Sequence, residues 1–116
     1  MRLVDLDPRW LMKEGRRIGF MFISPKNPRF FQSCFFQPTT FRDQCAAFVA
    51  ARGGDDEDRE FGRPDIQPCN ANTAWTPVGD IASLDFATLT VTPSLDGSAG
   101  GLWHGFITNG QIVGDY

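Results

Sequence analysis

The pattern of hydrophobic and polar residues predicts short strands in the first third of the chain. Apolar and acidic residues are interleaved over Leu3–Leu6, which favours a strand, and Pro8 would end it because proline has no amide hydrogen to donate. Residues 12–17 predict a turn. Residues 18–23 are apolar on both faces, as in a strand enclosed from both sides, and residues 30–36 predict the next strand.

One segment, Phe41–Arg52, has the periodicity of an amphipathic helix. Its predicted buried stripe consists of residues at helical spacing, namely Phe41, Cys45, Phe48, Val49 and Arg52. Thr40 can cap the start, with Asp43 reaching back, and Gly53-Gly54 can end the helix because glycine tolerates positive φ. We therefore expect a single short helix near the middle of the chain.

The C-terminal third predicts β-structure. Thr alternates with Leu and Val over residues 88–92, which favours a half-buried strand, and Pro93 would close it. Residues 102–108 and 111–113 flank Asn109-Gly110, a dipeptide suited to the two positive φ values of a type I′ hairpin turn. The expected fold is mainly β (α+β). We predict a compact antiparallel sheet or sandwich of about six strands, one short helix and a C-terminal hairpin, in a single domain over residues 1–116.

Charge is distributed unevenly along the 116 residues. Residues 1–54 carry nine Lys and Arg against four acidic residues, whereas residues 55–116 carry two Arg against ten acidic residues. Such polarity can orient a partner or pair the halves with each other, and it argues against a generally basic nucleic-acid binder. The acidic run at residues 55–60 predicts a solvated loop and lacks the spacing of a calcium loop.

Cysteine content and the N-terminal sequence favour a cytoplasmic protein. Cys34, Cys45 and Cys69 are an odd number at long spacings, which fits neither a zinc nor a disulfide framework and predicts buried free thiols in a reducing compartment. Acidic residues occupy the place where a signal peptide needs an apolar core, and no window has membrane-spanning length.

Three segments of the chain resemble a known family. They are LVDLDPRW at residues 3–10, LTVTPSL at residues 89–95 and WHGFITNG at residues 103–110. Together they are similar to a small uncharacterised family of bacteria and their phages, whose phage members are often labelled ammonia monooxygenase. Some members look like companions of bacterial ubiquitin-like conjugation genes and are suspected metal binders, so the resemblance implies a metal site. Residues 37–74 lie outside the resemblance.

The chain departs from the family at the metal ligands that the resemblance implies. Where the family has Cys-Pro-x-Cys, this chain has Ser24-Pro25-Lys26-Asn27, and Gly101 stands where a further Cys precedes the histidine. Only His104 is retained. A structural zinc site needs four ligands, and serine and asparagine are poor replacements for thiolate. We therefore expect no cofactor, unless Cys34 or Cys69 lies beside His104 in the fold.

Several residues could carry chemistry or recognition, and each also has a structural interpretation. His104 could be a remnant ligand or a base, with Asp5, Asp7, Ser94 and Asp96 as candidate partners by type, or it could be a histidine hydrogen-bonded inside or beside a sheet between Trp103 and Phe106. Asp5 and Asp7 would share one face of a strand, where the paired carboxylates could hold a divalent ion. Alternatively, they could accept hydrogen bonds from backbone amides at a turn or form an ion pair with Arg9. The three tryptophans could form a recognition surface or the core. The candidate binding residues are His104, Trp103, Asp5, Asp7, Arg9, Trp10 and Trp75.

The leading functional hypothesis is a non-enzymatic protein-binding module. The resemblance implies that it is encoded by a phage or mobile element and acts on a host factor such as a defence complex. Neither a membrane nor nucleic acid is an expected partner. One alternative is a metal-dependent hydrolase of ubiquitin-like processing, with His104 and Asp5 or Asp7 as ligands. A second alternative is a virion structural or assembly protein.

Overall fold

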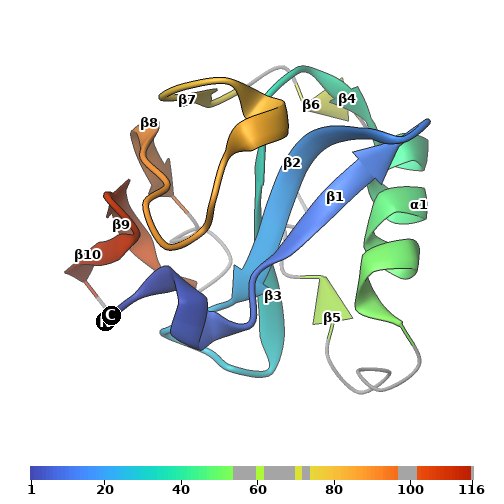
Figure 1. Ribbon diagram of the computed structural model, residues 1–116. Helices are drawn as coiled ribbons and strands as arrows, with labels where there is room; N and C mark the ends of the chain where they lie inside the picture. The colour runs from blue at the N-terminus through green and yellow to red at the C-terminus, as the bar shows by residue number, and fades with distance from the viewer. Residues whose placement is uncertain (54–59, 62–69, 72–73, 97–101, 116) are drawn as a thin grey trace.

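Two four-stranded sheets and a helix are stacked in three layers (Figure 1). The computed structural model describes residues 1–53, 60–61, 70–71, 74–96 and 102–115. Sheet A has the order β10-β9-β8-β7, and sheet B has the order β1-β2-β3-β5. Each pair of neighbouring strands is antiparallel except β3 and β5, which are parallel. The fold is therefore mainly β with one α-helix among the described residues, which confirms the predicted fold class.

Six of the strands in the described residues have five or more residues. These are β1 (Arg9–Lys13), β2 (Arg16–Ile23), β3 (Phe30–Phe35), β8 (Val91–Asp96), β9 (His104–Thr108) and β10 (Gln111–Asp115). Four others have two residues: β4 (Thr39–Thr40), β5 (Glu60–Phe61), β6 (Asn70–Ala71) and β7 (Thr76–Pro77). The helical elements are α1 (Phe41–Arg52) and the 3₁₀ helices η1 (Leu3–Leu6) and η3 (Ile81–Ser83).

Strand β2 is apolar on both faces because it lies in the middle layer. The expectation for residues 18–23 is confirmed: Phe20 and Phe22 belong to the core shared with sheet A, while Met21 belongs to the core under α1. Between β1 and β2 the register shifts at Leu11/Met12, which leaves Ile18 as an extra residue in β2. This bulge turns Ile18 toward the helix side, where it joins Met21.

Two expectations for the first residues were wrong. Leu3–Leu6 is a 3₁₀ helix rather than a strand. Leu3 and Leu6 are both buried, and a spacing of three residues places them on one side of a helix with three residues per turn. The predicted turn at residues 12–17 is shorter than expected, because β1 extends to Lys13 and β2 already begins at Arg16. Only Glu14 and Gly15 remain between the two strands, and both have positive φ (52° and 75°).

Helix α1 begins and ends where the sequence predicts. The Thr40 hydroxyl accepts a hydrogen bond from the Asp43 amide at 3.2 Å, and Gly53 has a φ of 67°. The predicted buried stripe was displaced, however. Gln44, Ala47 and Phe48 are buried, whereas Val49 is 58% exposed. Small alanines let the helix approach sheet B, and the Gln44 side chain can be buried because it donates to the Thr39 carbonyl at 3.0 Å.

Sheet A contains the predicted C-terminal hairpin. Asn109 and Gly110 have φ values of 48° and 73°, as a type I′ turn requires, and β9 and β10 pair from Thr108 and Gln111 outward. The prediction that Pro93 ends its strand was wrong, and the strand starts at Val91 rather than Thr88. The register between β8 and β9 shifts between Val91 and Leu95, and a bulge tolerates proline because its residues need not donate to the ladder.

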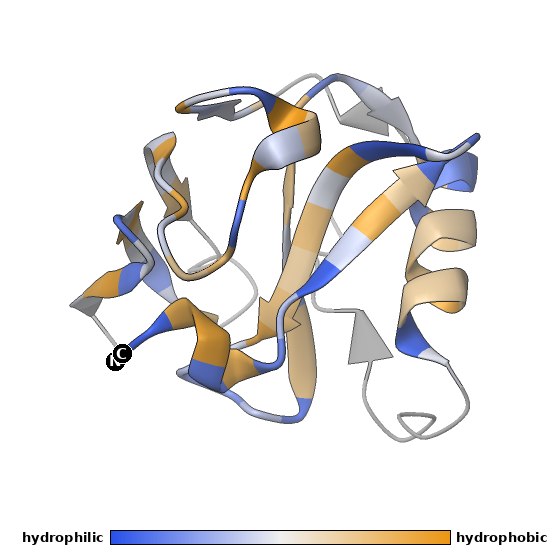
Figure 2. Cartoon of the chain, in the orientation of Figure 1, coloured by the Kyte–Doolittle hydropathy of each residue, from blue (hydrophilic) through white to orange (hydrophobic). Residues whose placement is uncertain are grey.

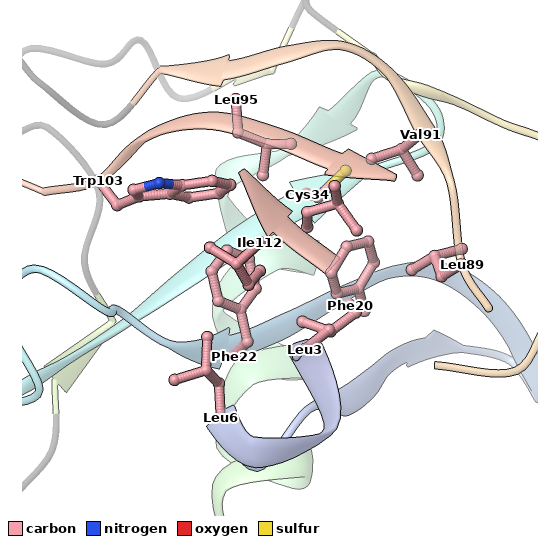
Figure 3. Close-up of a cluster of buried hydrophobic side chains, with 11 residues drawn as sticks. Leu3, Leu6, Phe20, Phe22, Cys34, Leu89, Val91, Leu95, Trp103 and Ile112 are labelled. Carbon is pink, nitrogen blue, oxygen red and sulfur yellow. The ribbon is translucent and has the colours of Figure 1, made fainter. Parts of the chain in front are cut away.

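The protein has two hydrophobic cores, which lie on opposite sides of sheet B. The larger core is enclosed between the sheets and closed at one end by η1; its buried members are Leu3, Leu6, Phe20, Phe22, Cys34, Leu89, Val91, Leu95, Trp103, Ile107 and Ile112 (Figure 3). The smaller core joins sheet B to α1. Hydrophobic residues accordingly run along β1 and β2 in the middle of the molecule (Figure 2).

The N-terminal segment lies against the last strand. Arg2 forms an isolated bridge with Gln111, the Ile112 amide donates to the Met1 carbonyl at 2.8 Å, and the Leu3 amide donates to the Gly110 carbonyl at 2.8 Å. The first residues of the chain consequently lie beside the start of β10 (Figure 1). This pairing holds η1 over the open end of the larger core.

Candidate functional site

Trp103 is a core residue that fastens the two sheets together. Its side chain is fully buried and meets Phe22 edge to face, with ring centroids 5.9 Å apart. The buried side chain of Gln32 in β3 donates to the Trp103 carbonyl at 2.8 Å and accepts from the Trp103 amide at 3.2 Å. Trp103 therefore positions the start of β9 and does not form part of a surface.

The other two tryptophans are partly buried at the margins of the larger core. The Trp10 ring stacks on Phe86 at 4.1 Å, and the Arg17 guanidinium lies 4.1 Å from its centroid. Arg17 also donates to the carbonyls of Ile81 and Leu84, at 3.0 and 3.1 Å. The Trp75 indole donates to the Ser94 carbonyl inside the β8 bulge at 3.1 Å. The tryptophans thus pack separate parts of the fold together and do not share one exposed surface.

Asp5, Asp7 and Arg9 form ion pairs and caps near η1. The Asp5 carboxylate binds Arg2 at 3.4 Å, and Asp7 binds Arg9. Arg9 also donates to the last carbonyls of α1, on Ala51 and Arg52, at 3.1 and 2.6 Å. A cation at these carbonyls stabilises the negative end of the helix. These residues therefore tie η1 and β1 to the helix, and both carboxylates already have guanidinium partners.

The residues at the position where the resemblance would imply a metal do not fit a zinc ion. The Ser24 hydroxyl accepts from the Asn27 amide at 3.4 Å, and the Asn27 side-chain oxygen accepts from the Arg29 amide at 3.3 Å, so both oxygens belong to the turn after β2. His104 is exposed in β9, on the face of sheet A that does not line the larger core. Among the described residues no group of three or more His, Cys, Asp or Glu could hold a metal ion.

The described cysteines are free and differ in exposure. Cys34 is buried in the larger core, and this burial raises the pKa of its thiol well above the usual 9.0. A thiol kept protonated is a poor nucleophile and a poor metal ligand. Cys45 in α1 is half-buried. Cys69, the acidic residues 55–59 and the glycine-rich residues 97–101 lie outside the described residues.

His104 lies on an open surface, the outer face of sheet A. We define this face by the exposed residues of β9 and β10 on the side away from sheet B, which are His104, Phe106, Thr108, Gln111 and Val113. Gly105 separates His104 from Phe106 and points inward, where a Cβ atom would overlap the Val113 carbonyl and the Trp103 ring. Because side chains alternate along a strand, His104 and Phe106 on either side of this inward position lie on the outer face.

Two apolar side chains lie directly opposite each other on the outer face of sheet A. Phe106 and Val113 are cross-strand partners, and they are 51% and 50% exposed. Neighbouring cross-strand side chains have Cβ atoms about 5 Å apart, so the pair forms one continuous apolar patch. Neither residue was among the binding residues expected from the sequence. The hairpin turn at Asn109-Gly110 could have revealed this cross-strand pair, because a two-residue loop fixes the register of every residue pair in the hairpin that follows it.

In the backbone register, His104 in β9 is paired with one residue on each neighbouring strand. Asp115 in β10 and Asp96 in β8 are its register partners on the two neighbouring strands. The sequence favoured Asp96 as a partner of His104 only by residue type and did not point to Asp115. The four strands of sheet A contain these two aspartates and neither Lys nor Arg. Among the side chains that define the outer face of sheet A, the apolar pair therefore lies two residues along β9 from His104.

Comparisons with known proteins give no further assignment. No protein-family model, curated protein or solved structure matches the chain. No helix within the described ranges combines the length and the apolar character required to traverse a bilayer.

Proposed function

We propose that this protein is a non-enzymatic protein-binding module that uses the outer face of sheet A as its binding surface. The observation that carries the proposal is the exposed pair Phe106 and Val113 at the centre of that face. Most large rings in the chain are enclosed, and Phe106 is the one aromatic residue with more than a third of its surface exposed among the residues whose burial is described. Exposed aromatic side chains surrounded by polar residues are typical of binding surfaces.

The nature of the partner follows from the resemblance to a family of bacteria and phages. A small phage or mobile-element protein of this kind acts on a host protein, for instance by blocking a defence complex. The residues that define the outer face of sheet A are exposed and lie on two adjacent strands, so they form an open sheet surface. An open face suits contact with another protein better than it suits catalysis.

Co-purification from host extract tests this function. The tagged wild-type protein and a Phe106→Ser variant serve as baits, with Val49→Ser as the matched control. Val49 is exposed to a similar degree but lies on α1 in the opposite layer. We expect wild type and Val49→Ser to retain one stoichiometric host protein and Phe106→Ser to lose it. Retention of that protein by correctly folded Phe106→Ser would show that this face does not bind it.

A second measurement separates binding from metal-dependent catalysis. We expect a His104→Ala variant to retain its fold and to contain no less metal than the wild type, as measured by mass spectrometry of purified protein. Stoichiometric zinc in the wild type that is lost in His104→Ala would contradict a purely protein-binding role. It would favour the metal-dependent hydrolase instead, for which turnover that stops on chelation is the decisive sign.

A further inference from the structure

Residues 1–6, which we call the arm, form a separate piece of structure that includes η1. Among the described residues the arm is held in two ways. Two backbone hydrogen bonds of 2.8 Å join it to the β9–β10 turn and to β10, and the side chains of Leu3 and Leu6 enter the larger core (Figure 3). Arg2 and Asp5 form an ion pair with each other inside the arm. This ion pair stays intact when the arm moves as a unit.

The hinge between the arm and β1 is short and strained. Only Asp7 and Pro8 separate η1 from β1. Asp7 has a φ of 49° and a ψ of 56°, in the left-handed region that residues with a Cβ atom rarely adopt. Proline also pushes the residue before it toward extended backbone angles. The position of the arm in the structure thus imposes on Asp7 a conformation that both its own side chain and Pro8 oppose.

One ion pair acts against this strain. The Asp7 carboxylate binds the Arg9 guanidinium, which also donates to the last carbonyls of α1. The Asp7 side chain is 52% exposed, and ion pairs of exposed groups contribute little to stability. The backbone conformation of Asp7 therefore has more influence on the hinge than its side chain has.

Every site that the arm occupies is present in identical form on a second copy of the chain. When two copies exchange arms, the hydrogen bonds to β10 and the burial of Leu3 and Leu6 are made again between the copies, so these contacts are equal in both forms. The difference then lies in the hinge, where an extended Asp7 loses its strain. Short hinges under strain favour such an exchange. The entropy of association opposes it, so the exchanged form increases with protein concentration.

We propose that this protein forms a dimer in which each arm lies on β10 and over the larger core of the other copy, with Asp7 extended. The partner at this surface is thus a second copy of the chain. The dimer carries two outer faces of sheet A, which makes it a bivalent form of the binding module. The exchange itself does not depend on the proposed function.

Disulfide trapping tests the exchange directly. The hydrogen bonds on either side of Arg2 and Gln111 make them a non-hydrogen-bonded pair, whose Cα atoms lie about 4.5 Å apart, within the range of a disulfide. Arg2→Cys and Gln111→Cys are mixed, unfolded, refolded together at high concentration and oxidised. We expect a covalent dimer on a non-reducing gel, because the arm of one variant then lies on β10 of the other.

A mixture of Arg2→Cys with Thr76→Cys is the matched control for this trapping. Thr76 is exposed on β7, at the opposite edge of sheet A, and the native cysteines are common to both mixtures. We expect little covalent dimer in the control. A covalent dimer of Arg2→Cys with Gln111→Cys that is no more abundant than in the control overturns the proposal.

Two substitutions at the hinge are expected to move the equilibrium in opposite directions. Asp7→Gly and Asp7→Val both remove the ion pair with Arg9, but glycine adopts the left-handed region freely, whereas a β-branched residue resists it. Because a dimer has two hinges, we expect the dissociation constant of the Asp7→Gly dimer to exceed that of the Asp7→Val dimer by at least about thirtyfold. Analytical ultracentrifugation after refolding at several concentrations measures both constants. Equal constants, or no dimer of either variant, overturn the proposal.

A Phe106→Ser variant separates arm exchange from association through the outer face of sheet A. This substitution changes that face and leaves the arm and the hinge as they are. We expect its dimer dissociation constant to match that of the wild type within about twofold. A dimer that disappears in Phe106→Ser is held by the outer face and not by the arms, and this result also overturns the proposal.

Discussion

Gln32 shows how one side chain determines the relation between two sheets. Its amide group satisfies both the backbone N–H and the backbone carbonyl of Trp103, at 3.2 and 2.8 Å, in a site from which water is excluded. These groups lie where β9 begins, beyond the reach of its ladder with β10. A buried peptide group without a partner costs more than the hydrogen bond itself contributes, so the glutamine is needed to keep this strand start in the core.

We predict that Gln32→Leu lowers the free energy of unfolding by about 2 to 4 kcal/mol, because it leaves two buried backbone groups of Trp103 unpaired while keeping the apolar volume similar. Urea unfolding followed by tryptophan fluorescence measures the loss. Gln37→Leu, a change at an exposed residue just after β3, should alter stability by less than about 0.5 kcal/mol. Equal effects of the two substitutions would refute the bridging role.

The start of α1 illustrates an element whose boundary is set by a cap. Thr40 has extended backbone angles, and its hydroxyl accepts from the Asp43 amide, one of the helix donors that lack a partner within the helix. The face that the helix buries is set by the packing partner rather than by the cap. Ala47 and Phe48 fit against sheet B, where Phe48 meets Phe31 edge to face with centroids 6.0 Å apart.

We predict that Thr40→Ala destabilises the protein by about 1 kcal/mol, because the Asp43 amide loses its acceptor. Thermal and urea unfolding by circular dichroism would measure the change. Thr76→Ala, at an exposed position of β7, serves as the comparison and should cost less than about 0.5 kcal/mol. A loss at Thr40 no greater than the loss at Thr76 would show that the cap is energetically irrelevant.

Local signals predicted some elements and could not predict others. The cap at Thr40, the turn at Asn109-Gly110 and the two apolar faces of β2 follow from short-range chemistry, and the structure confirms each. The prediction for Leu3–Leu6 failed because so short a run suits either a strand or a 3₁₀ helix. The prediction for Pro93 failed because, in a bulge, the residue does not have to donate the backbone hydrogen bond that proline cannot make. The burial of Gln44 in place of Val49 depended on contacts across layers, which no local pattern reveals.

The candidate site was predictable only in part. Trp103 and His104 were chosen as neighbours in sequence, but strand alternation buries one and exposes the other. Asp5 and Asp7 were chosen as paired carboxylates of a strand, and η1 instead gives each its own arginine. The partners of His104 across the hairpin follow from the turn register, so Asp115 and the pair of Phe106 with Val113 could have been placed from the sequence.

The layers are also linked by one ion pair whose strength depends on pH. Lys13 in β1 binds the Asp43 carboxylate in the first turn of α1 at 2.8 Å. The hydrogen bond from Lys13 lowers the pKa of Asp43 from its usual 3.8, and the hydrogen bond to Asp43 raises the pKa of Lys13 from its usual 10.5. Each partner thus favours the charged form of the other.

We predict that the ion pair of Lys13 with Asp43 stabilises the fold at every pH at which both side chains are charged. The contribution of Asp43 is complete above its usual pKa of 3.8 and is lost as pH falls through its lowered pKa. The contribution of Lys13 is complete below 10.5 and is lost as pH rises through its raised pKa. Unfolding of wild type and Asp43→Asn across the pH range should therefore differ at neutral pH and converge in strong acid. A difference that persists unchanged in strong acid would contradict the ion pair as its source.

The pairing of the first residues with the last strand has a consequence for biosynthesis. Met1 and Leu3 take backbone partners from Ile112 and Gly110, more than a hundred positions later in the chain. During synthesis on a ribosome, residues 1–3 cannot form these hydrogen bonds until the β9–β10 hairpin has emerged. Sheet B and α1 can therefore fold well before η1 covers the larger core. During that interval the apolar sides of Leu3, Leu6 and Phe20 are open to water, which is when a nascent copy of this protein most needs a chaperone.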